Sequence, residues 1–541
     1  MKAIKFIIAA AVATAAVACT GKFEEINKNP NNLTVGQVKS YNCIEPIIYS
    51  LGRNFQYDGM YFVNELCQVT AATNSGTRQE HMYNITASNH QGVWDKYVRS
   101  AFDCTHMMSL AEQEHDDFYK GVGLILKSIC FEQVCSIYGD MPFHEAFQGS
   151  SNLTPAFESQ EEVFKGIIVD LDSANVILAK NPKPLVGGFD AIYGDNAGKW
   201  RKFANSLRLR LLCRMGGIDS KYWSEMQAVI NDPETYPVFA SNADNATLTF
   251  QAVDPYKSYF GTGTSITSAG SRIEKNDITM RRLTQSFVKV TVIQNDKFET
   301  LFKDPRLDIW GVSGGDDKWI GTVAGCTEAE KKEAEKQKLC VPNYNTLAAE
   351  DQPGWWMDYS EILFIFAEGV NSGLLTMPKT AKEYYEAAVT ASIEKWAPFV
   401  KFNSKPKTIK ATDVTNFLAS GLASWDLAST ADETSVSKST EELIATQKWL
   451  SLLYVPWQMY HEWRRTEYPH VIIGNGTNYN QYELPTRFLY PAYTCSTNPK
   501  NVEAALQRMG ASANDMHGWL DWSYAKHHDG HRDPYTEHSA L

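Results

Sequence analysis

The sequence has no surplus of positive charge, no long run of like charge and no low-complexity tract. Its 51 Lys and Arg residues face 63 Asp and Glu residues, which gives a formal net charge of −12. Phosphate binding needs a surplus of Lys and Arg on one face, so this balance argues against nucleic acid as a partner. With 43% hydrophobic and 21% charged residues, the composition is that of a chain that folds around a core.

The motifs of several enzyme classes are also missing. There is no nucleophile elbow, no HExxH, no P-loop and no GxGxxG after a strand. No CxxC pair or Cys/His zinc spacing occurs, which argues against a structural metal. Carboxylate pairs suited to glycoside hydrolysis arise easily among so many acidic residues, so catalysis stays open as a minor alternative. We therefore expect neither catalytic activity nor a bound cofactor or metal.

The N-terminus has the pattern of a secretory signal. Two lysines precede the apolar stretch Phe6–Val17, which is too short to cross a bilayer of roughly 30 Å as a helix. Ala16 and Ala18 directly before Cys19 resemble a bacterial lipobox, so we expect removal of residues 1–18 and lipidation of Cys19. The alternative is an ordinary secretory peptide that happens to contain a cysteine. No later window holds 18 consecutive apolar residues.

Nine cysteines follow Cys19, and most lie within apolar helical patterns, where a free cysteine behaves as a small hydrophobe. Cys326 and Cys340 flank a charged segment and are the best-placed pair for a disulfide in an exported protein.

Apolar residues at three-to-four spacing predict helices before and after an irregular middle region. The predicted helices are Val35–Gly52, Gly92–Glu114, Asp117–Tyr138, Glu161–Ala179, Lys199–Met215, Lys221–Asn231, Tyr359–Asn371, Ala381–Trp396, Glu441–Glu462 and Asn501–Met509. Gly, Ser, Thr, Asp and aromatic residues dominate between them and predict loops with short strands. The expected organisation is a leash at 19–34, a helical array at 35–232, an insert at 233–357, a second helical part at 358–522 and a polar, histidine-rich, mobile tail at 523–541.

Several segments carry a resemblance to a known family. They are Phe23-Glu-Glu-Ile-Asn27, Tyr138-Gly-Asp-Met-Pro-Phe-His-Glu-Ala146, Asp190-Ala-Ile-Tyr-Gly-Asp195, Lys199-Trp-Arg-Lys-Phe203, Met357-Asp-Tyr-Ser-Glu361, Glu462-Trp-Arg-Arg-Thr-Glu-Tyr-Pro469 and Leu484-Pro-Thr-Arg-Phe-Leu-Tyr-Pro491. In this order and spacing they resemble the SusD/RagB family of nutrient-binding outer-membrane lipoproteins of Bacteroidetes. The sequence departs from the family pattern at Ser136-Ile137 and at Gly369.

The resemblance implies a mainly α, SusD-like fold with tetratricopeptide-type helical hairpins and an irregular insert of loops and short strands. It implies a lipid-anchored protein of the outer membrane, facing the cell exterior, that caps a SusC-like TonB-dependent transporter. Such a protein captures oligosaccharides, or in some members peptides, and passes them to the transporter. The alternative is a tetratricopeptide-type scaffold that binds other proteins at the cell surface.

The best-matched motifs look structural. Tyr138-Gly-Asp-Met-Pro142 is a helix stop, because Gly139 can take a positive φ and Pro142 forbids continuation. Glu361 and Glu368 lie seven residues apart and are expected to pair with Arg464, Arg465 or Arg487, since buried Arg–carboxylate pairs hold segments in register.

Carbohydrate capture needs flat apolar faces for sugar C–H surfaces and planar polar groups for hydroxyls, carried on loops that rigid helices position. Two loop regions have these residues, Ala71–Gln91 and Asp254–Trp319. The expected ligand-binding residues are Arg78, Tyr83 and Asn84 in the first, and Tyr256, Tyr259, Phe260, Trp310, Asp317 and Trp319 in the second. Trp310 and Trp319 are the strongest of them. The alternative for each aromatic ring is packing of the insert against the helices.

Overall fold

The computed structural model describes residues 37–72, 80–251, 253–261, 280–349, 351–402, 406–477, 481, 483–528, 530–532 and 536–538. The expected signal peptide and leash, the lipidation site Cys19 and the expected ligand residue Arg78 lie outside these residues.

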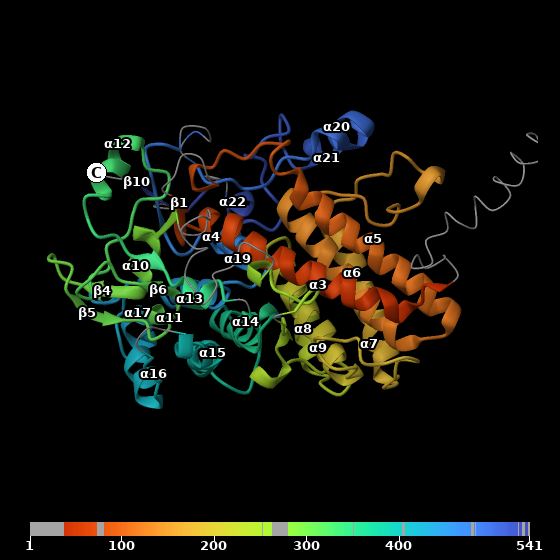
Figure 1. Ribbon diagram of the computed structural model, residues 1–541, viewed down its shortest axis with the longest axis horizontal. Helices are drawn as coiled ribbons and strands as arrows, with labels where there is room; N and C mark the ends of the chain where they lie inside the picture. The colour runs from red at the N-terminus through yellow and green to blue at the C-terminus, as the bar shows by residue number, and fades with distance from the viewer. Residues whose placement is uncertain are drawn as a thin grey trace, which may run out of the picture.

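Long helices form the N-terminal half of the protein (Figure 1). They are α3 Ser40–Asp58, α5 Gln91–Glu114, α6 Asp117–Tyr138, α7 Gln160–Ala179, α8 Ala197–Met215 and α9 Lys221–Ile230. From α5 to α8 each helix packs against the next, and α3 packs against α5. This stack of helical hairpins is the expected array. Helix α6 is long and apolar enough to cross a membrane, but most of it is buried among the other helices.

Local signals place the ends of these helices. The Asp116 carboxylate accepts hydrogen bonds from the backbone N–H groups of Phe118 and Tyr119 and so caps the start of α6. Gly139 ends α6 with a φ of 97°, as the sequence predicts. Helix α3 does not end at Gly52 but continues to Asp58. A π-helical turn (η2, Gly59–Val63) and the short helix α4 (Asn64–Leu66) then extend it.

The insert contains more regular structure than expected. Its strands and those next to it form antiparallel pairs: β1 Thr70–Ala72 with β3 Arg281–Leu283, β2 Ala246–Leu248 with β8 Gly354–Met357, β4 Val292–Gln294 with β5 Thr300–Lys303, and β6 Gly311–Val312 with β7 Val341–Pro342. Its described residues also form four short helices, α10 Gln285–Thr291, α11 Leu307–Trp310, α12 Glu328–Ala334 and α13 Tyr344–Leu347. Helix α12 forms in the charged segment because Thr327 and Glu330 make a capping box.

The C-terminal part is again helical. Its helices are α14 Tyr359–Asn371, α15 Ala381–Trp396, α16 Ala411–Leu418, α17 Trp425–Ser429, α18 Thr440–Ser451, α19 Gln458–Thr466, α20 Ala492–Thr497, α21 Pro499–Arg508 and α22 Tyr524–His527. The single helix expected at Glu441–Glu462 is two helices, because Pro456 and the left-handed Trp457 (φ 53°) interrupt it. Helix α14 packs against α15, α18 and α8, so one hydrophobic core joins both helical parts.

The histidine-rich tail packs against the body at several points, contrary to the expected mobile terminus. Strand β10 (Thr536–His538) pairs in parallel with β9 (Val471–Ile473). The His531 ring lies 2.6 Å from the carboxylate of Glu467. The nine cysteines of the described chain, Cys326 and Cys340 among them, are free thiols.

Short helical turns complete the description: the 3-10 turns are η3 Glu80–Met82, η4 Gly149–Ser151, η5 Asn242–Asp244, η6 Tyr259–Gly261 and η9 Ala397–Phe402.

Candidate functional site

A shallow cavity of about 470 Å³ lies where α3 meets the start of α5. It is lined by Arg53, Asn54, Tyr57, Phe62, Asn89, His90, Gly92, Val93, Lys96 and Tyr259, and we call it the tyrosine pocket. Asn89 comes from the first predicted loop region and Tyr259 from the second. The structure therefore brings the two regions together at one site.

Three tyrosines cluster at this pocket. Tyr61 lies one turn after Tyr57, at the junction of α3 and the π-helical turn, and the two ring centroids are 4.8 Å apart. The Tyr259 ring stands across Tyr57 at 5.2 Å and 80°. The backbone N–H of Tyr259 donates to Oε1 of the buried Gln56 at 2.9 Å, which fixes the loop on α3. Tyr57 and Tyr259 are half-buried, so each presents part of its ring to the pocket.

A buried carboxylate holds a lysine in the pocket wall. Asp58 is fully buried and accepts hydrogen bonds from Lys96, from the Tyr97 hydroxyl and, at 2.8 Å, from the Trp457 indole N–H. The Lys96 ammonium consequently lies 5.1 Å from the centroid of the Tyr57 ring, within cation–π range.

Polar groups suited to hydroxyl recognition surround the rings. The side-chain amides of Asn54 and Asn89 make no hydrogen bond within the described part of the chain, and both line the pocket. On the same wall, Arg53 donates to the carbonyl of Pro255 at 2.8 Å and holds the second loop in place. Aromatic faces beside planar amides are the combination that binds sugar rings.

Four of the expected ligand residues are instead core residues, which corrects the sequence interpretation. Tyr83 and Phe260 have no exposed surface, and Trp310 and Trp319 are each 1% exposed. Trp310 lies between Phe287 and Trp396, at centroid distances of 6.0 and 5.8 Å. Large rings gain most from removal of their apolar surface from water, so the insert uses them to pack against the helices.

Two further expected residues lie outside the tyrosine pocket. Tyr256 is half-buried; its ring packs on Tyr49 at 5.1 Å and its hydroxyl donates to Glu45 at 3.4 Å. Asn84 is exposed.

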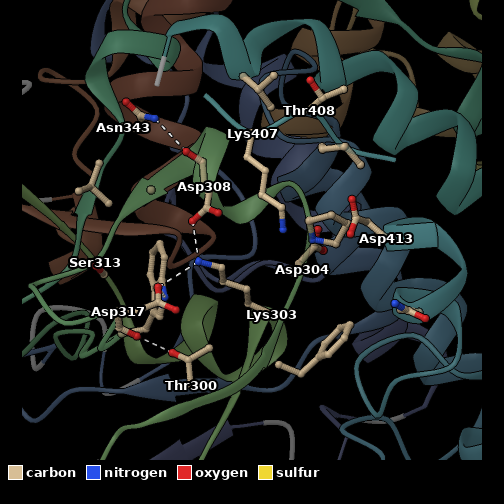
Figure 2. A pocket seen from close by; sticks show the side chains of 18 of the residues that line it. Thr300, Lys303, Asp304, Asp308, Ser313, Asp317, Asn343, Lys407, Thr408 and Asp413 are labelled. Carbon is tan, nitrogen blue, oxygen red and sulfur yellow. Dashed lines mark hydrogen bonds and ion pairs between the residues drawn. The ribbon is translucent and has the colours of Figure 1, made fainter. Parts of the chain in front are cut away.

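The last expected residue, Asp317, lines a second and larger cavity of about 680 Å³ on the insert, which we call the insert cavity (Figure 2). Lys303 reaches both Asp317 at 3.0 Å and Asp308 at 2.8 Å. Burial opposes the charge on Lys303, but the hydrogen bonds to Asp308 and Asp317 raise its pKa above the usual value. The Trp319 indole N–H donates to Asp317 at 3.2 Å from below the cavity surface.

The pocket residues that sequence reasoning missed lie on helices. Asn54, Tyr57 and Lys96 belong to α3 and α5, whereas the ligand residues were expected on loops. The four-residue spacing of Tyr57 and Tyr61 was an available signal, because residues that far apart share one helical face.

No group of three or more His, Cys, Asp or Glu side chains is placed to hold a metal ion within the described ranges.

Comparison with known proteins agrees with this architecture. A solved SusD homologue from Parabacteroides distasonis superposes with a TM-score of 0.71 at 19% identity, covering 90% of this chain and 97% of its own. A SusD homologue from Bacteroides fragilis gives 0.69 at 21% identity, with coverages of 89% and 99%. A chitin-binding SusD homologue from Flavobacterium johnsoniae gives 0.66 at 20% identity, with coverages of 88% and 98%.

No curated protein matches the sequence. A family model described as SusD-like, starch-binding and associating with the outer membrane matches residues 30–491. Since this match spans most of the sequence, the chain belongs to the SusD-like family of outer-membrane nutrient-binding proteins.

Proposed function

We propose that this protein captures oligosaccharides at the tyrosine pocket and passes them uncleaved to a SusC-like TonB-dependent transporter. The observation that carries the proposal is the arrangement of Tyr57 and Tyr259, two half-buried rings nearly at right angles. They lie beside the amides of Asn54 and Asn89, which bond to no described residue. A sugar ring can rest on one aromatic face while its hydroxyls meet the amides.

The frame around the pocket supports capture without rearrangement. The Tyr259 loop is tied to α3 through Gln56 and Arg53, and Lys96 is held by the buried Asp58. A site preorganised in this way loses little entropy on binding. A shallow pocket buries only part of a ligand, so we expect modest affinity.

The expected lipid at Cys19 would tether the body to the outer membrane through the leash at residues 19–34. Such a tether keeps captured ligand close to a transporter in the same membrane. This proximity raises the effective concentration of the ligand at the transporter. The transporter as partner, and the orientation toward the cell exterior, are part of the proposal.

Isothermal titration calorimetry with malto-oligosaccharides and chito-oligosaccharides tests the binding step. These probes follow the starch-binding description of the family and the chitin-binding relative. Tyr57→Ala combined with Tyr259→Ala should abolish saturable binding. Tyr236→Ala is the matched control, since Tyr236 is a half-buried tyrosine that packs under Arg208 and does not line the pocket.

Two outcomes would overturn the proposal. One is unchanged binding by the double tyrosine variant. The other is release of new reducing ends when the purified protein is incubated with the same oligosaccharides, because that would make it a hydrolase.

A further inference from the structure

Another cavity, of about 710 Å³, shares a single lining residue, Trp319, with the insert cavity and none with the tyrosine pocket. It lies among α10, β4, α12 and the loop between α17 and α18, at the end of the molecule that carries the labels α10, α12 and β4 in Figure 1. We call it the aliphatic cavity, because branched side chains form most of its wall: Val288, Val292, Ile293, Ile320, Leu339 and Val436. A cavity of this size and lining suits a small, mainly apolar ligand.

Phe298 lines the aliphatic cavity in a conformation that a bulky residue rarely adopts. It lies in the turn between β4 and β5 with a φ of 58°, and its side chain is 41% exposed. Asn295 fixes this turn, since its side-chain oxygen accepts the backbone N–H groups of Lys297 and Glu299 at 3.0 Å each. Glycine or asparagine is the usual residue at a left-handed position of a hairpin turn. A large ring that is strained and also exposed adds little to the core, so it points to contact with a ligand.

Two polar atoms of the cavity wall have no partner within the described part of the chain. One is the hydroxyl of Ser435, a residue that is only 3% exposed. The other is Oε1 of Gln294, whose Nε2 already donates to the Trp319 carbonyl at 3.1 Å. An unpaired buried polar atom costs about as much free energy as a lost hydrogen bond. A ligand that donates N–H or O–H groups would remove this cost.

The charges of the lining are mostly negative. They belong to Glu330, Glu333, Glu433 and Lys289. Glu333 pairs with Lys336 at the surface, whereas Glu433 is exposed and makes no ion pair among the described residues. Lys438 of the same loop does not line the cavity, and it donates to loop carbonyls, among them that of Ser435 at 2.6 Å. This balance disfavours a carboxylate or phosphate in the ligand and favours an ammonium group.

We propose that the aliphatic cavity binds a small amphipathic amine, with the apolar body of the amine against Phe298 and the branched side chains, and its ammonium group directed to Gln294 and Glu433. An ammonium group carries three N–H donors and no acceptor, which matches a wall of unpaired acceptors and carboxylates. The site is separate from the tyrosine pocket, so the inference does not rest on oligosaccharide capture.

Calorimetric titration of the purified protein with three probes tests the proposal. The probes are phenylbutylamine, phenylbutanol and phenylpentanoate, which share one apolar body and end in an ammonium, a hydroxyl or a carboxylate group. The amine should bind about fivefold or more tightly than the carboxylate, with the alcohol between them. Equal affinity for all three probes, tighter binding of the carboxylate, or no saturable binding of the amine at about 1 mM would overturn the proposal.

Phe298→Gly separates a ligand contact from a structural role. Glycine adopts the left-handed conformation without strain, so the unfolding temperature should stay the same or rise, while amine affinity should fall about fivefold or more. Phe102→Ala is the matched control, because Phe102 is a phenylalanine of α5 that is 51% exposed and lies outside the cavity; amine binding should not change. A lower unfolding temperature with unchanged affinity in Phe298→Gly would show that the ring serves the fold and would overturn the proposal.

A charge reversal tests the role of Glu433. Glu433→Lys should weaken binding of the amine about threefold or more and strengthen binding of the carboxylate probe. Glu225→Lys, the same change at an exposed glutamate of α9 outside the cavity, should leave both affinities unchanged. Equal effects of the two variants would overturn the proposal.

The variant that lacks both pocket tyrosines, Tyr57→Ala with Tyr259→Ala, distinguishes the two sites. It should keep its amine affinity, because neither tyrosine lines the aliphatic cavity. Loss of amine binding in this variant would place the amine in the tyrosine pocket, where Tyr57 already faces a cation, and would overturn the proposal.

Discussion

Arg465 and Glu368 form a two-pronged ion pair, in which both terminal guanidinium nitrogens donate to the carboxylate oxygens at 2.6 Å. The two residues stand on α19 and α14, 97 positions apart in the sequence. Lys448 of α18 joins the cluster through Glu462 at 3.0 Å. The cluster ties three helices of the C-terminal part together.

Replacing Arg465 by Met should destabilise the protein by about 3–5 kcal/mol. Glu368 and Glu462 would then face each other, with Lys448 as their remaining ion-pair partner among the described residues. Urea denaturation of the two proteins measures the difference. Lys336→Met is the matched control, since Lys336 pairs with Glu333 on the surface, and its cost should stay within roughly 0.5 kcal/mol. Equal costs would contradict a structural role for the cluster.

The same cluster predicts a pH dependence. Burial by itself would raise the pKa of Glu462, but Arg465 and Lys448 outweigh it and hold the pKa below the usual 4.5. A carboxyl with a depressed pKa stabilises the fold fully above its unfolded value, and this stabilisation is lost as the pH falls toward the folded value.

The stability gap between the wild type and Glu462→Gln should therefore be largest above about pH 5 and should narrow below it. Unfolding free energies measured across this range check the expectation. A gap that stays constant with pH would show that Glu462 does not titrate with folding.

Gly139 occupies a position that excludes a side chain on two counts. Its φ is 97°, and a Cβ atom there would lie 2.2 Å from Sδ of Met509. Gly139→Ala should lower the free energy of unfolding by at least about 1–3 kcal/mol through backbone strain. The clash with Met509 should lower it further. Gly510→Ala is the matched control, because Gly510 has a φ of 71° with nothing within 4 Å. Thermal unfolding should show the larger loss for Gly139→Ala; equal losses would mean that Met509 moves away without cost.

Local signals explain which helices could be predicted. Helices α6, α14 and α15 begin and end where the sequence predicts, because apolar periodicity and capping residues act within a few positions. The partner of Glu368 was among those expected. Glu361, in contrast, pairs with Arg210 of α8, through two bonds of 2.7 Å. Arg210 was not among the expected partners, because tertiary packing and not local sequence brings α8 next to α14.

The candidate site, too, could be predicted only where local sequence determines it. Tyr259 was predicted from the composition of its loop, but its meeting with Tyr57 depends on the Gln56 and Arg53 contacts between distant segments. In sequence, Trp310 and Trp319 resemble the aromatic residues that bind ligands at a protein surface. Their burial follows from how the insert closes on the helices, which no local pattern encodes.

Trp310→Ala provides the sharpest comparison between the sequence interpretation and the structure. Trp310 packs among Phe287, Trp396 and the Arg306 guanidinium, whose carbon lies 4.9 Å from the ring centroid. Replacing it by alanine should lower the free energy of unfolding by about 3–5 kcal/mol, as for other buried large aromatic residues. Oligosaccharide affinity measured on the protein that remains folded should not change, since Trp310 does not line the tyrosine pocket.

Tyr259→Ala should show the opposite behaviour. The ring is half-buried and its removal leaves the backbone bond to Gln56 in place, so the loss of stability should be smaller than for Trp310→Ala while oligosaccharide binding falls. Calorimetric titration together with denaturation of both variants separates the two roles. If Trp310→Ala lost oligosaccharide affinity while its stability stayed unchanged, the ligand would bind at the tryptophans of the insert. That result would contradict the assignment of the tyrosine pocket.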